Sequence, residues 1–484
     1  MLDRPTASKP RRPLEAPAIG HAATRRAIAL LCATAMLAAQ GRPAIAQVPA
    51  PTQQPRINVI RDAEIEELLR DYTRPILRAA KLSAQNIEVV LIGDRTFNAF
   101  VADGRRIFVN TGAIYDSTTP NQLIGVLAHE SGHIAGGHLA RMREQIANAQ
   151  TAAILAMLLA AGGIAAGAMT HQRDVGNLAT GAIMLPQTML MGSILSYQRQ
   201  QEDAADRAAV NFLNATGQST RGMLETFQRF AQDTLFLART VNPYLLSHPM
   251  PRERIAQLEN VARTSPYFER RDPPQLQFRH DMVRAKLAGF MERPDTILRA
   301  YPPSNTSLPA RYARAIAAYR FGNINNAIAQ IDALIAEQPK NPYFHELKGQ
   351  ALLESARARE SIAPLRQAVA LSNGAALIRI MLGQALVQSG DVAVAEEAIR
   401  NLRQGLDKEP SASLGWRQLA IAYGRKGDPA NADLASALAA FNEADFKTAR
   451  QLALRAKGRF PTGSPGWLKS DDIVNFKPPQ LTQK

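Results

Sequence analysis

Residues 127–138 read LAHESGHIAGGH, and this stretch decides how the first half of the chain is interpreted. It contains three of the eight histidines in the sequence, and His129 and His133 are four residues apart. On a helix, that spacing puts both imidazoles on one face, one turn apart, where they can reach a single metal ion. Glu130 lies between them, where a carboxylate can take a proton from an attacking water molecule. The pattern predicts a metal-dependent hydrolytic helix.

The third histidine of the stretch, His138, is out of register with the other two. A known three-histidine zinc pattern places its last histidine six residues after the second, and Leu139 occupies that position here. If the helix continues, five residues rotate His138 by ~140° from His133, at ~100° per residue. We therefore expect His138 to be a surface residue or a neighbour of the ligands, not a ligand itself.

A better third ligand lies downstream, in SYQRQQEDAADRAAV (residues 196–210). Glu202 and Asp206 are four residues apart there, so a helix places both carboxylates on one face. Glu202 would complete a site of two histidines and one glutamate around one zinc ion per chain, with the fourth position open. Asp206 could hold the ring N–H of a ligand histidine. The alternative is an acidic cluster on a solvated helix.

The N-terminal residues predict a secreted protein. Arg25 and Arg26 precede the apolar run AIALLCATAMLAA, and Ala44-Ile45-Ala46 offers a small-residue cleavage site. The only cysteine, Cys32, lies in that run, so the mature chain has no thiolate ligand and a metal site must use histidines and carboxylates. The net charge of +15 could favour an anionic membrane surface. Nucleic acid binding is less favoured, because the sequence has no basic run interleaved with aromatic residues.

The chain divides into two structural regions by its residue patterns. A helix begins near Asp62, and the segments NIEVVLIGD (86–94) and RRIFVNTG (105–112) indicate strands, so the first region is a mixed α+β domain. Two apolar stretches, 152–169 and 177–195, are rich in Ala and Gly or contain a proline. We favour buried or interfacial helices there, with a membrane-spanning hairpin as the alternative.

The second region is repetitive. Ala315, Gly349 and Gly383 are spaced by 34 residues, and Ala420 follows after 37. Two further registers of small residues keep the same spacing: Gly322, Ala356, Gly390 and Gly427, and Ala327, Ser361, Ala395 and Ala432. Small residues at this period are typical of tetratricopeptide repeats, in which closely packed helix pairs require them. An irregular helical bundle is the alternative.

The predicted organisation has six parts. They are a signal peptide (1–46), a spacer (47–61), the peptidase domain (62–265), a linker with first helices (266–304), the all-α repeat domain (305–460) and a tail (461–484). Within the tail, PTGSPGWLKSDD is interpreted as a loop.

HESGH followed by E-x-x-A-D resembles the gluzincin metallopeptidases of the HtpX and CAAX-prenyl-protease type. The segments NAF (98–100), IFVNTG (107–112) and SHPMPRERI (247–255) strengthen this resemblance. It implies a zincin-type α+β domain in which His129, His133 and Glu202 bind zinc and Glu130 is the general base. It also implies that His248 lies near the metal and covers the open position in a latent enzyme. From the residues alone, a histidine before a proline in a loop could equally stabilise the oxyanion or only pack. The arginine that follows the His-Pro pair in the family corresponds to Arg254.

The resemblance further implies a binding strand and a cellular role. The strand Ile107, Phe108, Val109 and Asn110 is expected to form a sheet edge to which an extended substrate adds. We expect an exported, periplasmic endopeptidase that degrades misassembled outer-membrane proteins and also acts as a chaperone. Its repeats would bind the barrel assembly machinery, with a possible peripheral membrane contact. The alternatives are a membrane-embedded protease and a repeat scaffold with a latent peptidase site.

Overall fold

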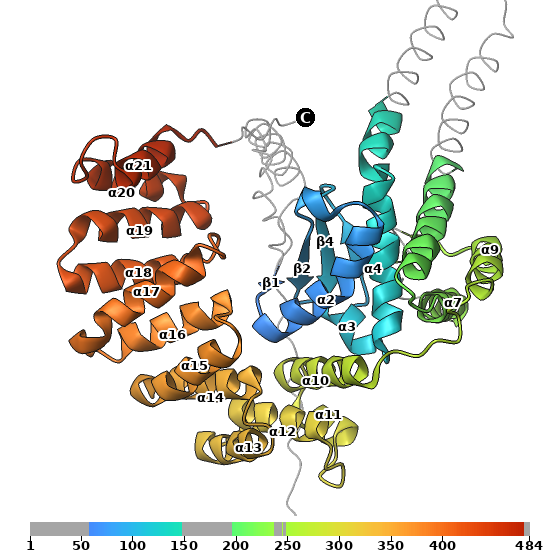
Figure 1. The fold of residues 1–484 in the computed structure, drawn as a ribbon, viewed down its shortest axis with the longest axis horizontal. Coiled ribbons are helices and arrows are strands. Elements are labelled where there is room, and N and C mark those ends of the chain that lie inside the picture. Colours follow the sequence, from blue (N-terminus) through green and yellow to red (C-terminus); the bar gives the residue numbers. More distant parts are fainter. Residues whose placement is uncertain (1–57, 148–195, 237–243, 245–247, 479–484) are drawn as a thin grey trace, which may run out of the picture. The chain divides into compact units, whose positions relative to one another are not determined.

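The computed structural model describes residues 58–147, 196–236, 244 and 248–478, and Figure 1 shows its fold. The predicted signal peptide and both apolar stretches, 152–169 and 177–195, lie outside these residues. Among the residues described, no helix is both long enough and apolar enough to cross a bilayer.

The first region contains one four-stranded sheet flanked by helices. The strands are β1 (Val59–Ile60), β2 (Glu88–Ile92), β3 (Ala99–Val101) and β4 (Arg106–Asn110), in the order β1-β2-β4-β3. Strands β2 and β4 are parallel, and the outer two pairs are antiparallel. The two strands expected from the sequence, β2 and β4, are confirmed as the centre of the sheet.

The expectation that residues 107–110 form a sheet edge is wrong. Strand β4 is bonded on both sides, and Ile107, Phe108, Val109 and Asn110 are all buried. The physical reason is a tight turn at 102–105 that folds Ala99–Val101 back onto β4, with Ala99 opposite Val109. The edge beside the motif helix is therefore β3.

Five helical segments pack around this sheet. They are α2 (Ala63–Ala79), α3 (Thr111–Asp116), α4 (Pro120–Ala135), the helical residues 196–215 and α7 (Arg221–Phe236). Helix α2 begins where predicted, because the carboxylate of Asp62 accepts the N–H of Ile65 at 2.9 Å. The motif helix α4 is buried along almost its whole length, and apolar residues from it, α2, α7 and the sheet share one core. A further helix, α9 (Arg252–Arg263), follows the His-Pro segment.

The second region is a row of antiparallel helix pairs, as the repeats predict. The helices are α12 (Leu308–Phe321), α13 (Ile324–Glu337), α14 (Pro342–Glu354), α15 (Ala358–Leu371), α16 (Ala376–Gln388), α17 (Ala395–Leu406), α18 (Ser413–Lys426) and α19 (Pro429–Asn442). The small residues have the expected function. A Cβ on Gly349 or Gly383 would lie 2.4 Å from the Cγ of Leu365 or Leu402 on the next helix. The turn at 407–412 is longer than the turns at 338–341 and 372–375, as expected from the extra residues in this repeat.

Four more helices precede and follow these pairs or join the regions. They are α10 (Pro274–Met291), α11 (Pro294–Ala300), α20 (Phe446–Lys457) and α21 (Pro465–Asn475). Helix α21 corrects the loop expected at PTGSPGWLKSDD. Ser464 caps it by accepting the N–H of Trp467 at 3.3 Å, and Pro465 stands at its first turn, so both residues begin a helix.

Candidate metal centre

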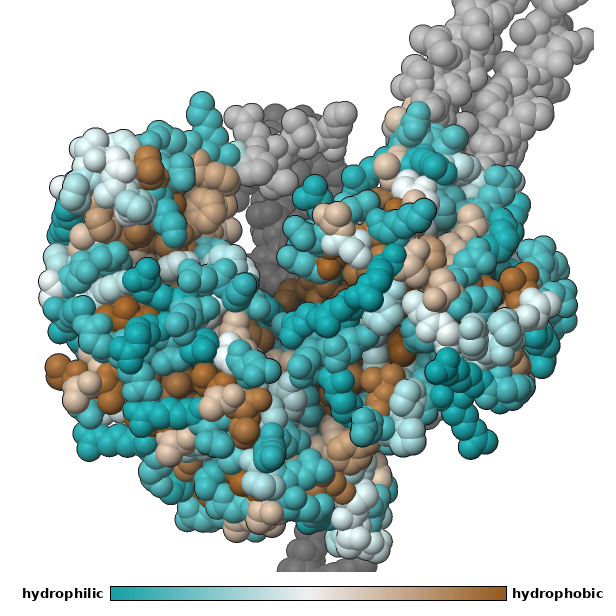
Figure 2. Space-filling model, viewed as in Figure 1, coloured by the Kyte–Doolittle hydropathy of each residue, from teal (hydrophilic) through white to brown (hydrophobic). Residues whose placement is uncertain are grey.

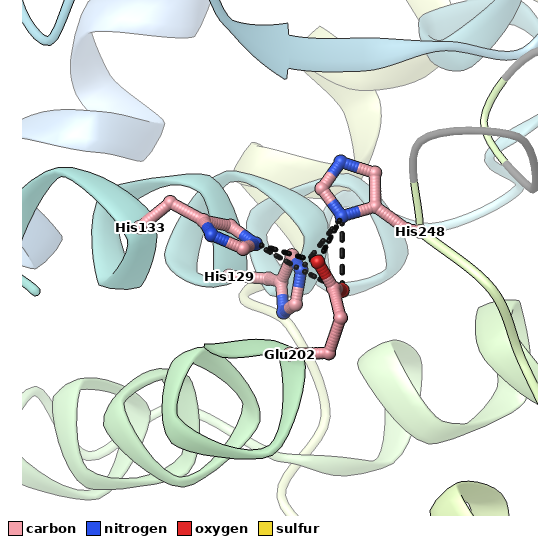
Figure 3. A group of neighbouring side chains, drawn as sticks. All are labelled: His129, His133, Glu202 and His248. Carbon is pink, nitrogen blue, oxygen red and sulfur yellow. Dashed lines mark hydrogen bonds and ion pairs between the residues drawn. The ribbon is translucent and has the colours of Figure 1, made fainter. Parts of the chain in front are cut away.

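The predicted site residues come from three separate segments and meet beside the sheet (Figure 3). Helix α4 supplies His129, Glu130 and His133, and the helical residues 196–215 supply Glu202. His248 enters from the segment before α9, where its ring stacks on Tyr244 with ring centroids 4.6 Å apart. Residues that are far apart in the sequence therefore share one buried cluster.

The nitrogen and oxygen atoms of this cluster have the spacing of ligands around one metal ion. His129 Nε2 lies 3.0 Å from His133 Nε2 and 3.3 Å from Glu202 Oε2, and His133 Nε2 lies 3.4 Å from Glu202 Oε1. Zinc bonds of ~2.0–2.1 Å in a tetrahedron place ligand atoms ~3.3 Å apart. The donor set of two imidazoles and a carboxylate thus fits zinc.

His248 stands at the fourth corner of this arrangement. Its Nδ1 lies 3.3 Å from His129 Nε2 and 3.0 Å from Glu202 Oε2, and all four ligand atoms fall within 4.8 Å of one another. Its Nε2 lies 3.5 Å from Glu130 Oε1. His248 therefore lies against two of the predicted ligands and next to Glu130.

Contacts behind the cluster orient His129. Its Nδ1 lies 2.8 Å from Asp206 Oδ1, and Arg254 donates to both oxygens of Asp206 at 2.7 and 2.9 Å. Burial raises the pKa of Asp206, but the Arg254 guanidinium outweighs it and keeps this pKa below the usual range. An ionised carboxylate can only accept, so the Nδ1 proton of His129 faces Asp206, and the Nε2 lone pair faces the cluster once the second ring proton is lost. Three electron-rich groups converge there, as a cation site requires.

Burial and neighbouring charges shift the pKa values of the cluster in different directions. Burial lowers the pKa of His129, but Asp206 and Glu202 outweigh it and raise this pKa to about 9. Burial and the neighbouring His129 hold the pKa of His133 well below its ordinary value. Burial alone would raise the pKa of Glu202, yet His248 and His129 keep it below the usual range. A metal ion entering this centre must therefore displace a proton from His129.

Glu130 is fully buried next to the cluster. Neither of its side-chain oxygens has a hydrogen-bond partner among the residues that the structure describes. Burial raises its pKa, more than the nearby His248 and His129 lower it. A carboxyl group in this state accepts a proton more readily than a solvated one, which suits a general base.

His138 is not one of the four clustered residues, but it touches one of them. Helix α4 ends at Ala135, so the continuous helix expected from the sequence is wrong. The His138 ring is buried, and its Nδ1 lies 3.0 Å from Nδ1 of His133. Instead of pointing away, the side chain lies behind a predicted ligand.

A cleft of about 280 Å³ opens onto the cluster. Phe100 and Val101 of β3 line it, together with Leu139 and Met142 from the helical residues 138–147. Sequence reasoning used the NAF segment only as a family landmark and missed that it supplies the cleft wall. Its strand has only three residues, so no alternating pattern identifies it.

Comparisons with known proteins agree with this geometry. Residues 60–262 match peptidase family M48, and residues 312–376 match a tetratricopeptide repeat family. The chain is 24% identical to the putative beta-barrel assembly-enhancing protease of Vibrio cholerae over 384 residues, which is 78% of this chain and 76% of that protein. It is 26% identical to the beta-barrel assembly-enhancing protease of Escherichia coli K12 over 341 residues, 69% and 66% of the two chains.

A third relative matches a shorter part of the chain. The metalloprotease YcaL of Escherichia coli K12 is 28% identical over 195 residues, covering 39% of this chain and 69% of that protein. The expected gluzincin resemblance, the α+β peptidase domain followed by repeats and the metalloprotease activity are confirmed.

Proposed function

We propose that this chain, a metallopeptidase with an M48 domain at residues 60–262 and tetratricopeptide repeats behind it, is a periplasmic zinc endopeptidase of outer-membrane protein quality control. The observation that carries the chemistry is the convergence of His129, His133 and Glu202 beside the buried Glu130. The names of the relatives that match most of the chain support the cellular role.

His129, His133 and Glu202 would hold the zinc ion. When bound, the ion polarises the scissile carbonyl and makes water more acidic. Glu130 takes the proton of the attacking water, which its raised pKa favours, and delivers it to the leaving amine. Asp206 and Arg254 keep His129 oriented throughout, and the apolar walls of the cleft limit competing water.

The substrate would bind along β3 instead of β4. Because β3 is the outer strand and its Phe100 and Val101 line the cleft, an extended chain can pair with its free side next to Glu130. Peptide substrates methylated at successive backbone nitrogens test this pairing. We expect cleavage to fall at alternate positions, where methylation removes a donor to the edge strand, and a uniform effect would contradict it.

We propose that His248 makes the enzyme latent, because its Nδ1 holds the fourth corner of the cluster. Replacing His248 with Ala is expected to increase peptidase activity, with His345→Ala on α14, outside the metal cluster, as the matched control. A loss of activity would instead assign His248 to transition-state stabilisation. A latent peptidase site is also compatible with the alternative that the chain is a repeat scaffold and that its repeats act without proteolysis.

The repeats would bind the barrel assembly machinery and its misassembled clients, and thereby support a chaperone role. On the face seen in Figure 2, hydrophobic residues form separate patches among hydrophilic ones over the repeat helices. Such patches are suited to contacts with protein partners.

Carbonate extraction tests the proposed periplasmic location, since retention of the mature protein in the membrane fraction would favour the membrane-embedded alternative.

The substitution Glu130→Gln tests the enzymatic proposal. Purified protein should retain its zinc but cleave an unfolded outer-membrane barrel protein about 10²–10⁴-fold more slowly. In cells, the variant should fail to replace the wild type in outer-membrane quality control. Full complementation would show that proteolysis is dispensable and that the repeat scaffold carries the function.

A further inference from the structure

The helix is broken shortly after His133, the second predicted ligand histidine, and the catalytic proposal gives this break no role. Helix α4 stops at Ala135, Gly137 adopts a left-handed φ of +63°, and a new helical segment begins at His138. This turn brings the buried His138 ring back against His133. We propose that His138 is a positioning residue that fixes the orientation and tautomer in which His133 binds the metal, an inference that rests on the proposed ligand role of His133.

The two nitrogens of the His133 ring face different partners. Its Nε2 points into the metal cluster, and its Nδ1 lies 3.0 Å from Nδ1 of His138. A ring that binds a metal ion through Nε2 carries its proton on Nδ1 when neutral. That proton must be donated to Nδ1 of His138, whose own proton then lies on Nε2. His138 thus selects the binding tautomer of His133, as carboxylates and carbonyls do behind other metal-bound histidines.

Gly136 provides the space for this contact. A Cβ at Gly136 would lie 2.2 Å from Nε2 of His138, so any larger residue there would displace the ring. The backbone of Gly136 is right-handed, with φ −73°, and does not itself require glycine. The turn is also tied to the neighbouring ligand segment, because Gln201 Nε2 donates to the backbone oxygen of His138 at 3.3 Å.

A purely structural histidine in the same protein has a different environment. The His280 ring is fully buried, and its two nitrogens contact the hydroxyl of Tyr72 at 2.9 Å and the carbonyl of Ser117 at 2.8 Å. Those contacts join helices and lie outside the metal cluster. His138, in contrast, directs its nitrogen to a predicted ligand and lines the cleft beside it.

The test measures zinc affinity of the full mature chain by competition with a chelator. His138→Ala is expected to weaken zinc binding about 10–100-fold. His138→Asn should restore most of the affinity, because its Oδ1 can accept at the place of Nδ1. Gly136→Ala should weaken binding like His138→Ala, and the double variant should show no further loss, because both changes break one contact. The visible absorption of the cobalt-loaded protein should change with His138→Ala and return with His138→Asn.

Three further variants separate the possible outcomes. Gly424→Ala, where an added Cβ meets open space, and His345→Ala control for general effects of the two substitution types. His133→Ala must abolish tight zinc binding, and its failure to do so would overturn the proposed ligand set itself. If His133→Ala loses zinc while His138→Ala and Gly136→Ala bind it like the wild type, the positioning role of His138 is wrong. Additive losses in the double variant would equally contradict it.

Discussion

Glu130 sets the expected response of the enzyme to acid. The group must be ionised to act as a base, and burial raises its pKa above the ordinary value of 4.5. Activity should therefore fall, as the pH is lowered, at a higher pH than a solvated glutamate would give. A profile of kcat/KM against pH measures this limb. An acidic midpoint at or below 4.5 would contradict the assignment of Glu130 as the base.

Asp206 should matter for metal retention. With Asp206→Asn, the carboxylate 2.8 Å from His129 Nδ1 is lost, and Arg254 keeps only Glu202 of its two buried carboxylate partners. We expect zinc affinity to fall about 10–100-fold. Asp203→Asn, on the same helix but outside the metal cluster, is the matched control, and zinc titration of both variants gives the comparison. Equal affinities would show that Asp206 does not orient the ligand.

Close contacts between helices of the repeats predict which glycines are needed for stability. Gly349→Ala places a methyl group 2.4 Å from the Cγ of Leu365, between α14 and α15, and should cost about 1–3 kcal/mol of the free energy of unfolding. Gly424→Ala on α18 meets open space and should be neutral or slightly stabilising. Urea denaturation measures both, and equal stabilities would show that α14 and α15 do not need the glycine.

Elements with a strong local pattern could be predicted from the sequence, and those set by tertiary contacts could not. Helix α2 and the repeat helices each have a clear period, and strands β2 and β4 are apolar runs bounded by Gly, Asp and Asn. The ligand candidates followed from four-residue spacings on helices, because residues at this spacing lie on one helical face whatever the tertiary packing. The position of His138 depended on one left-handed glycine, and the edge strand β3 is too short for a pattern. Helix α21 was missed because Ser464 and Pro465, which begin a helix, also occur in turns.

A buried ionic cluster links the two regions and predicts a pH dependence for the whole molecule. Lys286 Nζ lies 2.8 Å from Asp62, 3.2 Å from Glu64 and 3.9 Å from Glu346, so one cation faces three carboxyl groups. Burial, which Lys286 only partly offsets, raises the pKa of Glu346 from 4.5 to about 8. The folded protein therefore keeps a proton that the unfolded chain releases above pH 4.5.

Stability from this proton is complete below pH 4.5 and is lost as the pH rises through about 8. Glu346→Gln mimics the protonated group at every pH, so the variant should lose less stability than the wild type between about pH 5 and pH 9. Thermal unfolding across that range measures the difference. If the stabilities of the two proteins changed with pH in parallel, the proposed proton on Glu346 would be contradicted.

The proposed metal centre also determines when the protein can become active. His129 and His248, which meet in the cluster, are separated by 119 residues of chain. Contacts between such distant segments form late in folding, because a long loop must first be closed. A chain that is still being made cannot assemble its proposed metal centre. Completion of the fold thus assembles the ligand side chains and, under the proposed latency, also brings His248 over them, so an unfinished copy and a resting copy are both inactive.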